Sequence, residues 1–221
     1  MLPKTILSFL NRLKKNNSRE WMEEHRKEYE KAKADFYSFT EMLIREMATF
    51  DSSVGSLKAK DCAFRINRDV RFSKNKEPYK TNMGAYINQN GKKGRGAGYY
   101  VHVEPGNIFM AAGVWMPEPG DLAKIRQEID YNWLEWEKII RDKSMRKYFL
   151  EGVDESDKLV RPPKGYEADN PAIEFIKLKS FIIRKEFSQV STLDQSFVKT
   201  VADQFKSARK MMAFIDVALD G

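Results

Sequence analysis

The chain has 221 residues, of which 42% are hydrophobic and 32% are charged, and its formal net charge is +7. This composition is typical of a folded globular protein and excludes an intrinsically disordered chain. No apolar run approaches the ~20 residues of a membrane-spanning helix. A single cysteine, Cys62, excludes an internal disulfide. The first residues lack the apolar core of a signal peptide, so we expect a cytoplasmic protein.

The positive charge is concentrated in one segment, residues 58–95. This segment holds 11 Lys and Arg residues against 3 Asp and Glu residues, so the remainder of the chain is close to neutral. Such a concentration favours an anionic ligand more than a uniformly basic surface does. The alternative is a solvated basic loop, since runs of charge commonly have no other role.

Apolar residues at helical spacing predict two helices at the N-terminus. The first covers residues 6–13. Asn17 and Glu20 have the spacing of a capping box, which predicts that a second, long helix opens there and continues along an apolar stripe from Trp21 to Phe50. His25 lies on this stripe, and we interpret it as a packed or capping residue rather than a ligand.

The middle of the chain is predicted to form strands. Residues 64–72 alternate between apolar and polar side chains, which predicts a first strand. A second strand is predicted over residues 83–88. Two more, over residues 99–104 and 108–115, are predicted to form a hairpin across Pro105-Gly106-Asn107.

The C-terminal part returns mainly to helices. The predicted elements are helices from residue 122, over 132–140 and around 145–149, a loop over 152–170, a helix over 172–178, an extended segment over 180–187 and a final helix from Ser191 to Leu219. Helices, then strands, then helices indicate an α+β fold. We therefore predict an antiparallel or mixed sheet of about five strands with long helices on one face, in a single domain of residues 1–221.

The candidate site lies on the predicted strand over residues 64–72 and on its neighbours. A strand would place Arg65, Asn67, Asp69 and Arg71 on one face. Two arginines around an aspartate can bind a phosphate or carboxylate bidentately. We therefore expect a small anionic ligand. The full predicted set is Arg65, Asn67, Arg68, Asp69, Arg71, Lys76, Tyr79, Lys80, Asn82, His102 and Glu104.

Two other functions fit the same residues. Aromatic residues interleave with the basic ones, as stacking platforms interleave with phosphate contacts, so sequence-independent nucleic-acid binding is one alternative. The other is a structural or interaction protein in which the charged row is an internal ion network that fixes the register of the strand. The sequence does not decide between these readings, and it leaves open whether any reaction is catalysed.

Several other kinds of chemistry have little support in the sequence. His102 and Glu104 share a strand face, but a zinc site normally needs three or four protein ligands, so no metal is expected. Either residue has the chemistry of a general acid or base. The glycine-rich stretch Gly91–Gly98 has neither P-loop spacing nor a dinucleotide-binding context, and no G-x-S-x-G motif occurs. We expect no cofactor.

Two strings are the most distinctive in the chain: Asn67-Arg68-Asp69-Val70-Arg71-Phe72-Ser73 and Pro78-Tyr79-Lys80-Thr81-Asn82. With further strings across nearly the whole chain, they resemble a bacterial and fungal family catalogued as domain of unknown function 2461. The resemblance implies one intracellular domain and carries over no activity. One departure is Asn75, where related sequences often have an acidic residue, so this chain is slightly more basic.

Overall fold

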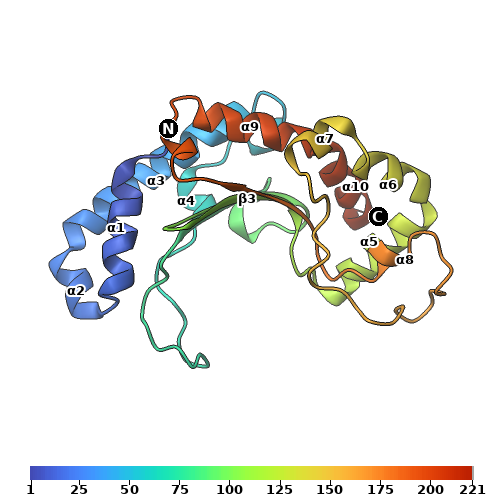
Figure 1. Cartoon of the computed structure of the whole chain (residues 1–221), viewed down its shortest axis with the longest axis horizontal. Coiled ribbons are helices and arrows are strands. Elements are labelled where there is room, and N and C mark those ends of the chain that lie inside the picture. The colour runs from blue at the N-terminus through green and yellow to red at the C-terminus, as the bar shows by residue number, and fades with distance from the viewer. Residues whose placement is uncertain (221) are drawn as a thin grey trace. The chain divides into compact units, whose positions relative to one another are not determined.

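The computed structural model describes residues 1–220 and shows an α+β protein with one four-stranded antiparallel sheet (Figure 1). The strands pair in chain order as β1 (Met83–Ile87), β2 (Gly98–Glu104), β3 (Asn107–Val114) and β4 (Phe181–Phe187). The predicted α+β class and the hairpin of β2 and β3 are confirmed. The prediction of about five strands is wrong by one, because the described residues form four.

The chain divides into two compact units. Unit 1 comprises residues 1–94, 100–110 and 186–203, and unit 2 comprises residues 95–99, 111–185 and those from Gln204 onward. This division does not test the prediction of a single domain over residues 1–221, which stays a prediction. No helix among the described residues is long and apolar enough to cross a membrane.

The helices follow the predicted order, with more interruptions than expected. They are α1 (Lys4–Lys15), α2 (Arg19–Glu24), α3 (Arg26–Met47), α4 (Ala59–Cys62), α5 (Pro119–Tyr131), α6 (Trp133–Ile140), α7 (Lys143–Tyr148), α8 (Ile173–Ile176), α9 (Phe197–Ser207) and α10 (Arg209–Asp220). Short 3-10 turns occur at Ser52–Val54, Gly91–Lys93 and Ser191–Leu193. The single final helix predicted from Ser191 is therefore wrong: that residue starts a 3-10 turn, and Ala208 separates α9 from α10.

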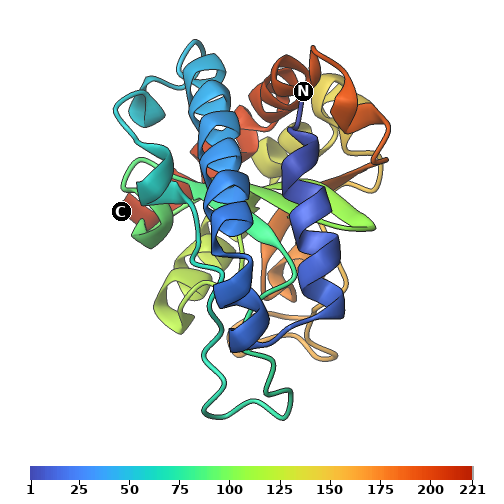
Figure 2. The same ribbon diagram turned by 90° about the vertical axis from the view of Figure 1, so that its left-hand side faces the viewer.

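Unit 1 contains α1 and α3, which lie side by side (Figure 2). The long helix predicted from Trp21 is interrupted at His25, whose Nδ1 lies 2.8 Å from the carbonyl oxygen of Trp21. The two rings also stack, with centroids 4.2 Å apart. The reading of His25 as a packed or capping residue is confirmed. The N-cap of α2 is Ser18 rather than Asn17, since the Ser18 side chain accepts the backbone N–H of Trp21 at 3.2 Å.

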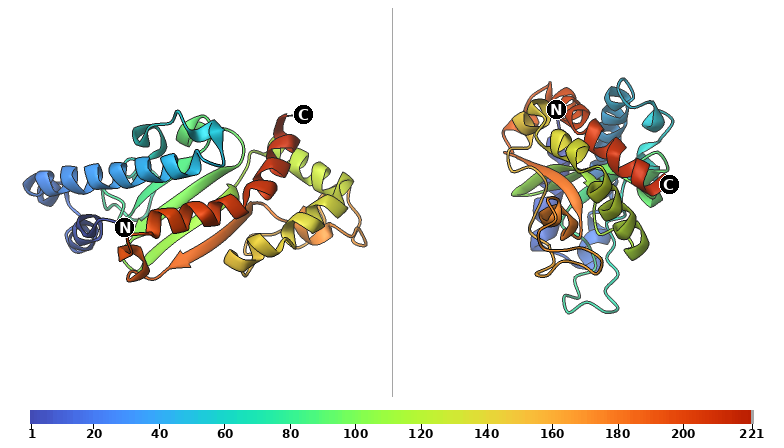
Figure 3. Two further views of the ribbon diagram at one scale, coloured as in Figure 1. Left: turned by 90° about the horizontal axis from the view of Figure 1, so that it is seen from above. Right: turned by 90° about the vertical axis from the view of Figure 1, so that its right-hand side faces the viewer.

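Unit 2 has a core centred on Trp136 of α6, which is fully buried. Its ring meets those of Phe175, Phe181 and Phe214 at centroid distances of 5.8, 6.2 and 5.2 Å. Helix α10, which carries Phe214, also packs against α5 (Figure 3). This unit was well predicted, because aromatic and aliphatic residues recur at helical spacing in α5, α6 and α10.

The strand predicted over residues 64–72 does not form. Residues 64–82 instead make an extended, irregular hairpin, called the arm below, which runs away from β1 as a long loop (Figures 1 and 2). Its two legs share one isolated bridge, between Asn67 and Tyr79. At the far end, the Asp69 side chain accepts the backbone N–H of Arg71 at 3.2 Å. Such local side-chain-to-backbone bonds compete with a strand ladder.

Pro78 in the returning leg is a second reason why the predicted strand does not form. Proline has no N–H to donate to a ladder, so a regular two-stranded ribbon cannot continue past it. The remaining backbone bonds between the legs are few: Lys80 N–H donates to Ile66 at 2.8 Å, and Arg68 N–H donates to Pro78 at 2.9 Å. We call residues 68–77 the tip of the arm, and residues 64–66 with 80–82 its base.

Candidate functional site

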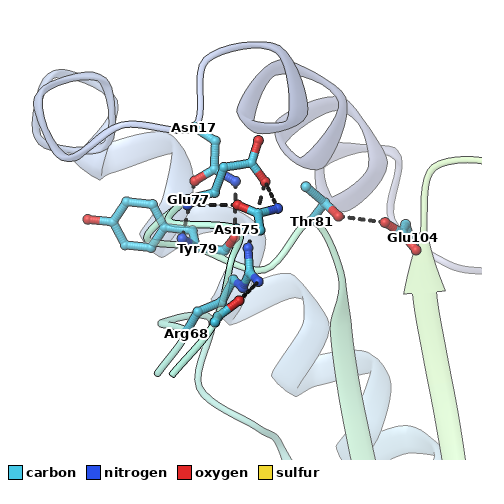
Figure 4. Close-up of polar contacts among 8 residues, drawn as sticks. Asn17, Arg68, Asn75, Glu77, Tyr79, Thr81 and Glu104 are labelled. Atoms are coloured by element: carbon cyan, nitrogen blue, oxygen red, sulfur yellow. Dashed lines mark hydrogen bonds and ion pairs between the residues drawn. The ribbon is translucent and has the colours of Figure 1, made fainter. Parts of the chain in front are cut away.

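The tip of the arm uses most of its polar side chains on itself. Arg68 donates to the hydroxyl of Ser73 at 3.3 Å and lies 3.7 Å from the carboxylate of Glu77 (Figure 4). Lys76 Nζ donates to the carbonyl oxygen of Val70 at 3.1 Å. These contacts give the tip a defined conformation without a hydrophobic core.

Asp69 and Arg71 form a second local pair at the tip. The guanidinium of Arg71 donates to both carboxylate oxygens of Asp69, at 3.0 and 2.7 Å. These hydrogen bonds hold the pKa of Asp69 below its usual value. Both side chains are largely exposed, so the pair is strongly screened by water. The predicted row does not lie on a regular strand, and two of its members, Asp69 and Arg71, bond to each other.

The returning leg of the arm is attached to the helices by Asn17. The side-chain amide of Asn17 donates to the carbonyl oxygen of Tyr79 at 3.0 Å, and its oxygen accepts the Tyr79 N–H at 3.1 Å (Figure 4). One side chain thus satisfies both backbone groups of Tyr79, as a neighbouring strand would. This use explains why Asn17 does not cap α2.

The base of the arm meets the open face of β2. Alternate residues of this strand are buried, while Tyr100, His102 and Glu104 between them are only half-buried. The Tyr100 hydroxyl lies 2.9 Å from His102 Nδ1, and His102 Nε2 lies 3.4 Å from a Glu104 oxygen. Asn82 Nδ2, from the base of the arm, lies 3.5 Å from His102 Nδ1. We call the three β2 residues the Tyr100–His102–Glu104 chain.

Ionisation of Glu104 sets the direction of the hydrogen bonds in the Tyr100–His102–Glu104 chain. Burial alone would raise the pKa of Glu104, but hydrogen bonds from Thr81 and His102 outweigh it and leave the pKa below its usual value. The Thr81 hydroxyl donates to Glu104 at 2.5 Å (Figure 4). A carboxylate only accepts, so a neutral His102 donates through Nε2, and its Nδ1 then accepts from Tyr100. Such a chain can pass a proton from the phenol to the imidazole.

Apolar contacts hold the Tyr100–His102–Glu104 chain in place. The His102 ring stacks on Phe109 with centroids 4.6 Å apart, and Phe64 meets Tyr100 edge-on at 6.3 Å. Gly84 in β1 leaves room for the phenol, because a Cβ there would lie 2.6 Å from the Tyr100 hydroxyl oxygen. Burial raises the pKa of Tyr100 to about 12. Tyr100 is therefore a neutral phenol over the physiological range.

Two cations at the base of the arm have no acidic partner within ion-pairing distance among residues 1–220: Arg65 and Lys80. They stand on opposite legs, where Lys80 N–H is bonded to Ile66, the residue after Arg65. Lys80 Nζ lies 5.5 Å from the centre of the Phe64 ring. Burial, together with the positive charge of Arg65, lowers the pKa of Lys80. This pair differs from the cations that are engaged at the tip.

The structure separates the predicted site residues into two groups. Arg65, Lys80 and Asn82 lie at the base of the arm, close to the open face that carries His102 and Glu104. In the second group, Arg68, Asp69, Arg71 and Lys76 use their side chains within the arm, whereas Asn67 and Tyr79 pair through their backbones and Tyr79 also bonds to Asn17.

Several residues that contribute to the site lie outside the predicted set. Tyr100 has a local signal, because its i, i+2 spacing with His102 predicts a shared strand face. Thr81 is adjacent to two predicted residues but has no motif of its own. Asn17 and Phe109 become neighbours of the site only through the fold.

No metal centre and no reactive thiol add to this site. Among residues 1–220 there is no group of three or more His, Cys, Asp and Glu side chains placed to hold a metal ion. Cys62 is buried, and burial raises its pKa to about 11. A thiol is nucleophilic as its thiolate, so Cys62 has the character of a core residue.

Unit 2 has a groove of its own, with a volume of about 730 Å³, between α6 and α10. It is lined by exposed apolar residues, Leu134 and Val217 among them, and by the ion pair of Lys210 with Asp142 at 2.7 Å. None of the predicted site residues lies in it. We therefore place the candidate site in unit 1.

Comparison with known families gives one result. The family model described as Conserved hypothetical protein (DUF2461) matches residues 5–214. The chain belongs to the DUF2461 family. The resemblance found in the sequence is thus confirmed, and the DUF2461 match includes the arm, the sheet and both units. No curated protein and no solved structure matches the chain.

Proposed function

We propose that unit 1 binds a small anionic ligand, a phosphate or a carboxylate, at the base of the arm. Arg65 and Lys80 supply the positive charge. The observation that carries this proposal is their arrangement: two neighbouring cations, one of them half-buried, without an acid in ion-pairing distance among the described residues. An anion would relieve their mutual repulsion and would make charge-assisted hydrogen bonds to both.

The surroundings of the two cations support a small ligand. The Phe64 ring packs beside Lys80 and also contacts Tyr100, so the ammonium group is partly shielded from water. Reduced contact with water strengthens an ion pair. Asn82 is a neutral donor two residues after Lys80 on the same leg, and its side-chain nitrogen lies 3.5 Å from His102 Nδ1. The negative charge of Glu104 is engaged by Thr81 and His102.

The Tyr100–His102–Glu104 chain is an acid–base group connected to this proposed site through the Phe64 ring, which contacts both Tyr100 and Lys80. If the ligand is a substrate, a proton taken up by Tyr100 would be balanced by transfer of the phenol proton to His102. The resulting imidazolium would face the Glu104 carboxylate, which stabilises it. This arrangement supports an enzymatic role without identifying the reaction.

Anion-dependent thermal stabilisation tests the proposal. Inorganic phosphate and citrate, each titrated up to about 50 mM at constant ionic strength, should raise the melting temperature of the wild-type protein, since a ligand that binds only the native state stabilises it. Arg65→Gln and Lys80→Met should each abolish the increase. Arg71→Gln is the matched control, because it removes one positive charge from the same arm but leaves the base intact.

Two results would contradict the proposal. One is a wild-type protein whose melting temperature responds no more to phosphate and citrate than to chloride. The other is an equal loss of response in Arg71→Gln and Arg65→Gln, which would show that net charge rather than the base of the arm attracts the anion.

A further inference from the structure

The tip of the arm presents an aromatic ring to solvent. Phe72 is 96% exposed, whereas phenylalanine is usually buried in a folded protein. The guanidinium carbon of Arg71 lies 5.8 Å from the centre of this ring. The fold therefore holds Phe72 outward, beside a cation, at the end of the arm.

Local contacts within the tip hold the loop in the conformation that exposes Phe72. Arg68 ties the tip together through Ser73 and Glu77, and Lys76 bonds to the carbonyl oxygen of Val70. These bonds close the loop around Phe72 without using its ring. An ordered loop with an outward aromatic side chain loses less conformational entropy on binding than a disordered one.

The charge of the tip is the second observation. Residues 68–77 hold four cations against two acids. Lys74 has no hydrogen-bond or ion-pair partner among residues 1–220. Lys76 bonds only to a backbone carbonyl, so its charge is not neutralised. The tip is thus an aromatic platform with uncompensated positive charge beside it.

We propose that the tip of the arm binds single-stranded nucleic acid. The exposed face of Phe72 stacks on a base, and Lys74 and Lys76 contact the phosphates on either side. Stacking on an aromatic ring combined with basic side chains along the backbone is how proteins hold single strands without reading sequence. This proposal is independent of the small-anion site, because Arg65 and Lys80 lie at the other end of the arm.

Two other partners explain the tip less well. An acidic polypeptide would pair with the same lysines but would make no use of the exposed Phe72 ring. Duplex DNA offers phosphates, but its bases are already stacked on one another and are not open to Phe72. The combination of ring and cations therefore favours a single strand.

Fluorescence anisotropy with a labelled oligothymidine of about 20 nucleotides tests the proposal. The wild-type protein should bind it at about 25 mM salt, with an affinity that falls linearly with salt on a log–log scale. Phe72→Leu should weaken binding by about 5- to 150-fold, which corresponds to the loss of one base stack. Phe72→Trp should retain binding. Phe72 is exposed, so these variants should fold normally.

Charge variants separate stacking from phosphate contacts. The double variant Lys74→Gln/Lys76→Gln should reduce the salt slope by about 1.4, because each phosphate contact on a single strand contributes about 0.7. Lys14→Gln/Lys15→Gln, which removes two exposed lysines from α1, is the matched control and should leave the slope unchanged. Both double variants have the same net charge.

Three outcomes would overturn the proposal. The first is no binding at low salt. The second is equal affinity of wild-type protein and Phe72→Leu, which would remove the stacking role. The third is competition by poly-L-glutamate as effective as that by unlabelled oligothymidine at equal charge, which would indicate an acidic polypeptide as the partner.

Discussion

The tip and the base of the arm carry similar side chains but use them differently. At the tip, the arginines pair with acids a few residues away, as Arg71 does with Asp69. At the base, Arg65 and Lys80 lie on opposite legs, burial and the charge of Arg65 lower the pKa of Lys80, and neither forms an ion pair among residues 1–220. The Phe64 ring beside Lys80 contacts Tyr100 of β2, which comes from a distant part of the chain.

This difference shows that a high local density of charge does not by itself identify a binding site. The densest part of the arm forms its own ion pairs and hydrogen bonds, and the Arg71–Asp69 pair among them is exposed and therefore weak. The sparser base combines partial burial with unpaired charge, and that combination favours an external anion. The two ends should therefore respond to substitution in different ways.

Releasing the arm from the helices should have the largest effect on stability. Asn17→Ala leaves the N–H and carbonyl groups of Tyr79 without their partners, and each lost bond is worth about 1 kcal/mol or more. We expect a loss of about 2 kcal/mol in the free energy of unfolding, measured by urea denaturation. Amide hydrogen exchange should rise across residues 64–82.

The neighbouring residue supplies the control for this variant. The Asn16 side chain donates to the exposed carbonyl oxygen of Arg12 at the end of α1, so Asn16→Ala should change the free energy of unfolding by less than about 0.5 kcal/mol. Equal losses in Asn16→Ala and Asn17→Ala would show that Asn17 does not hold the arm.

The pH dependence of the unfolding free energy tests the role of Glu104 on the sheet face at the base of the arm. The folded-state pKa of Glu104 is lowered, so this group stabilises the protein fully above its ordinary value of 4.5, and the contribution disappears as pH falls through the lower folded value. Glu104→Gln removes this contribution. The difference in unfolding free energy between wild-type and variant proteins should therefore shrink as pH falls below 4.5.

Thr81→Val provides a second check, because it removes the hydroxyl that donates to Glu104. We expect a loss of about 1–2 kcal/mol at neutral pH and a weaker dependence on acid. A difference between wild type and Glu104→Gln that stays constant from neutral to acid pH would show that the carboxylate is not selectively stabilised in the folded state.

Local patterns were sufficient to predict much of the fold. The turn sequence Pro105-Gly106-Asn107 predicted the hairpin of β2 and β3, and helical spacing predicted α1, α5, α6 and the helices near the C-terminus. Period-two alternation failed at residues 64–72, where it is present but the backbone N–H of Arg71 bonds to the Asp69 side chain. Alternation describes which side chains share a face, and it does not supply a neighbouring strand.

The candidate site was predicted only in part for a related reason. His102 and Glu104 share a strand face by their spacing, and Lys80 and Asn82 stand two residues apart. The contacts that join these pairs span 20 residues from Asn82 to His102 and 23 from Thr81 to Glu104. Such contacts depend on how β1 and β2 pair, and no local motif encodes them.

The smallest expected effects on stability are those of replacing Arg71 at the tip and Arg65 at the base of the arm. Arg71→Gln breaks an exposed pair, so the urea unfolding midpoint should not change measurably. Arg65→Gln removes a like charge from beside Lys80, and the midpoint should stay the same or rise slightly, because the repulsion is relieved. The lysine ammonium resonances, followed by NMR, should show a higher pKa for Lys80 in Arg65→Gln and no change in Arg71→Gln. A marked loss of stability in Arg65→Gln would instead indicate a structural ion network at the base, and the proposed anion site would lose its main support.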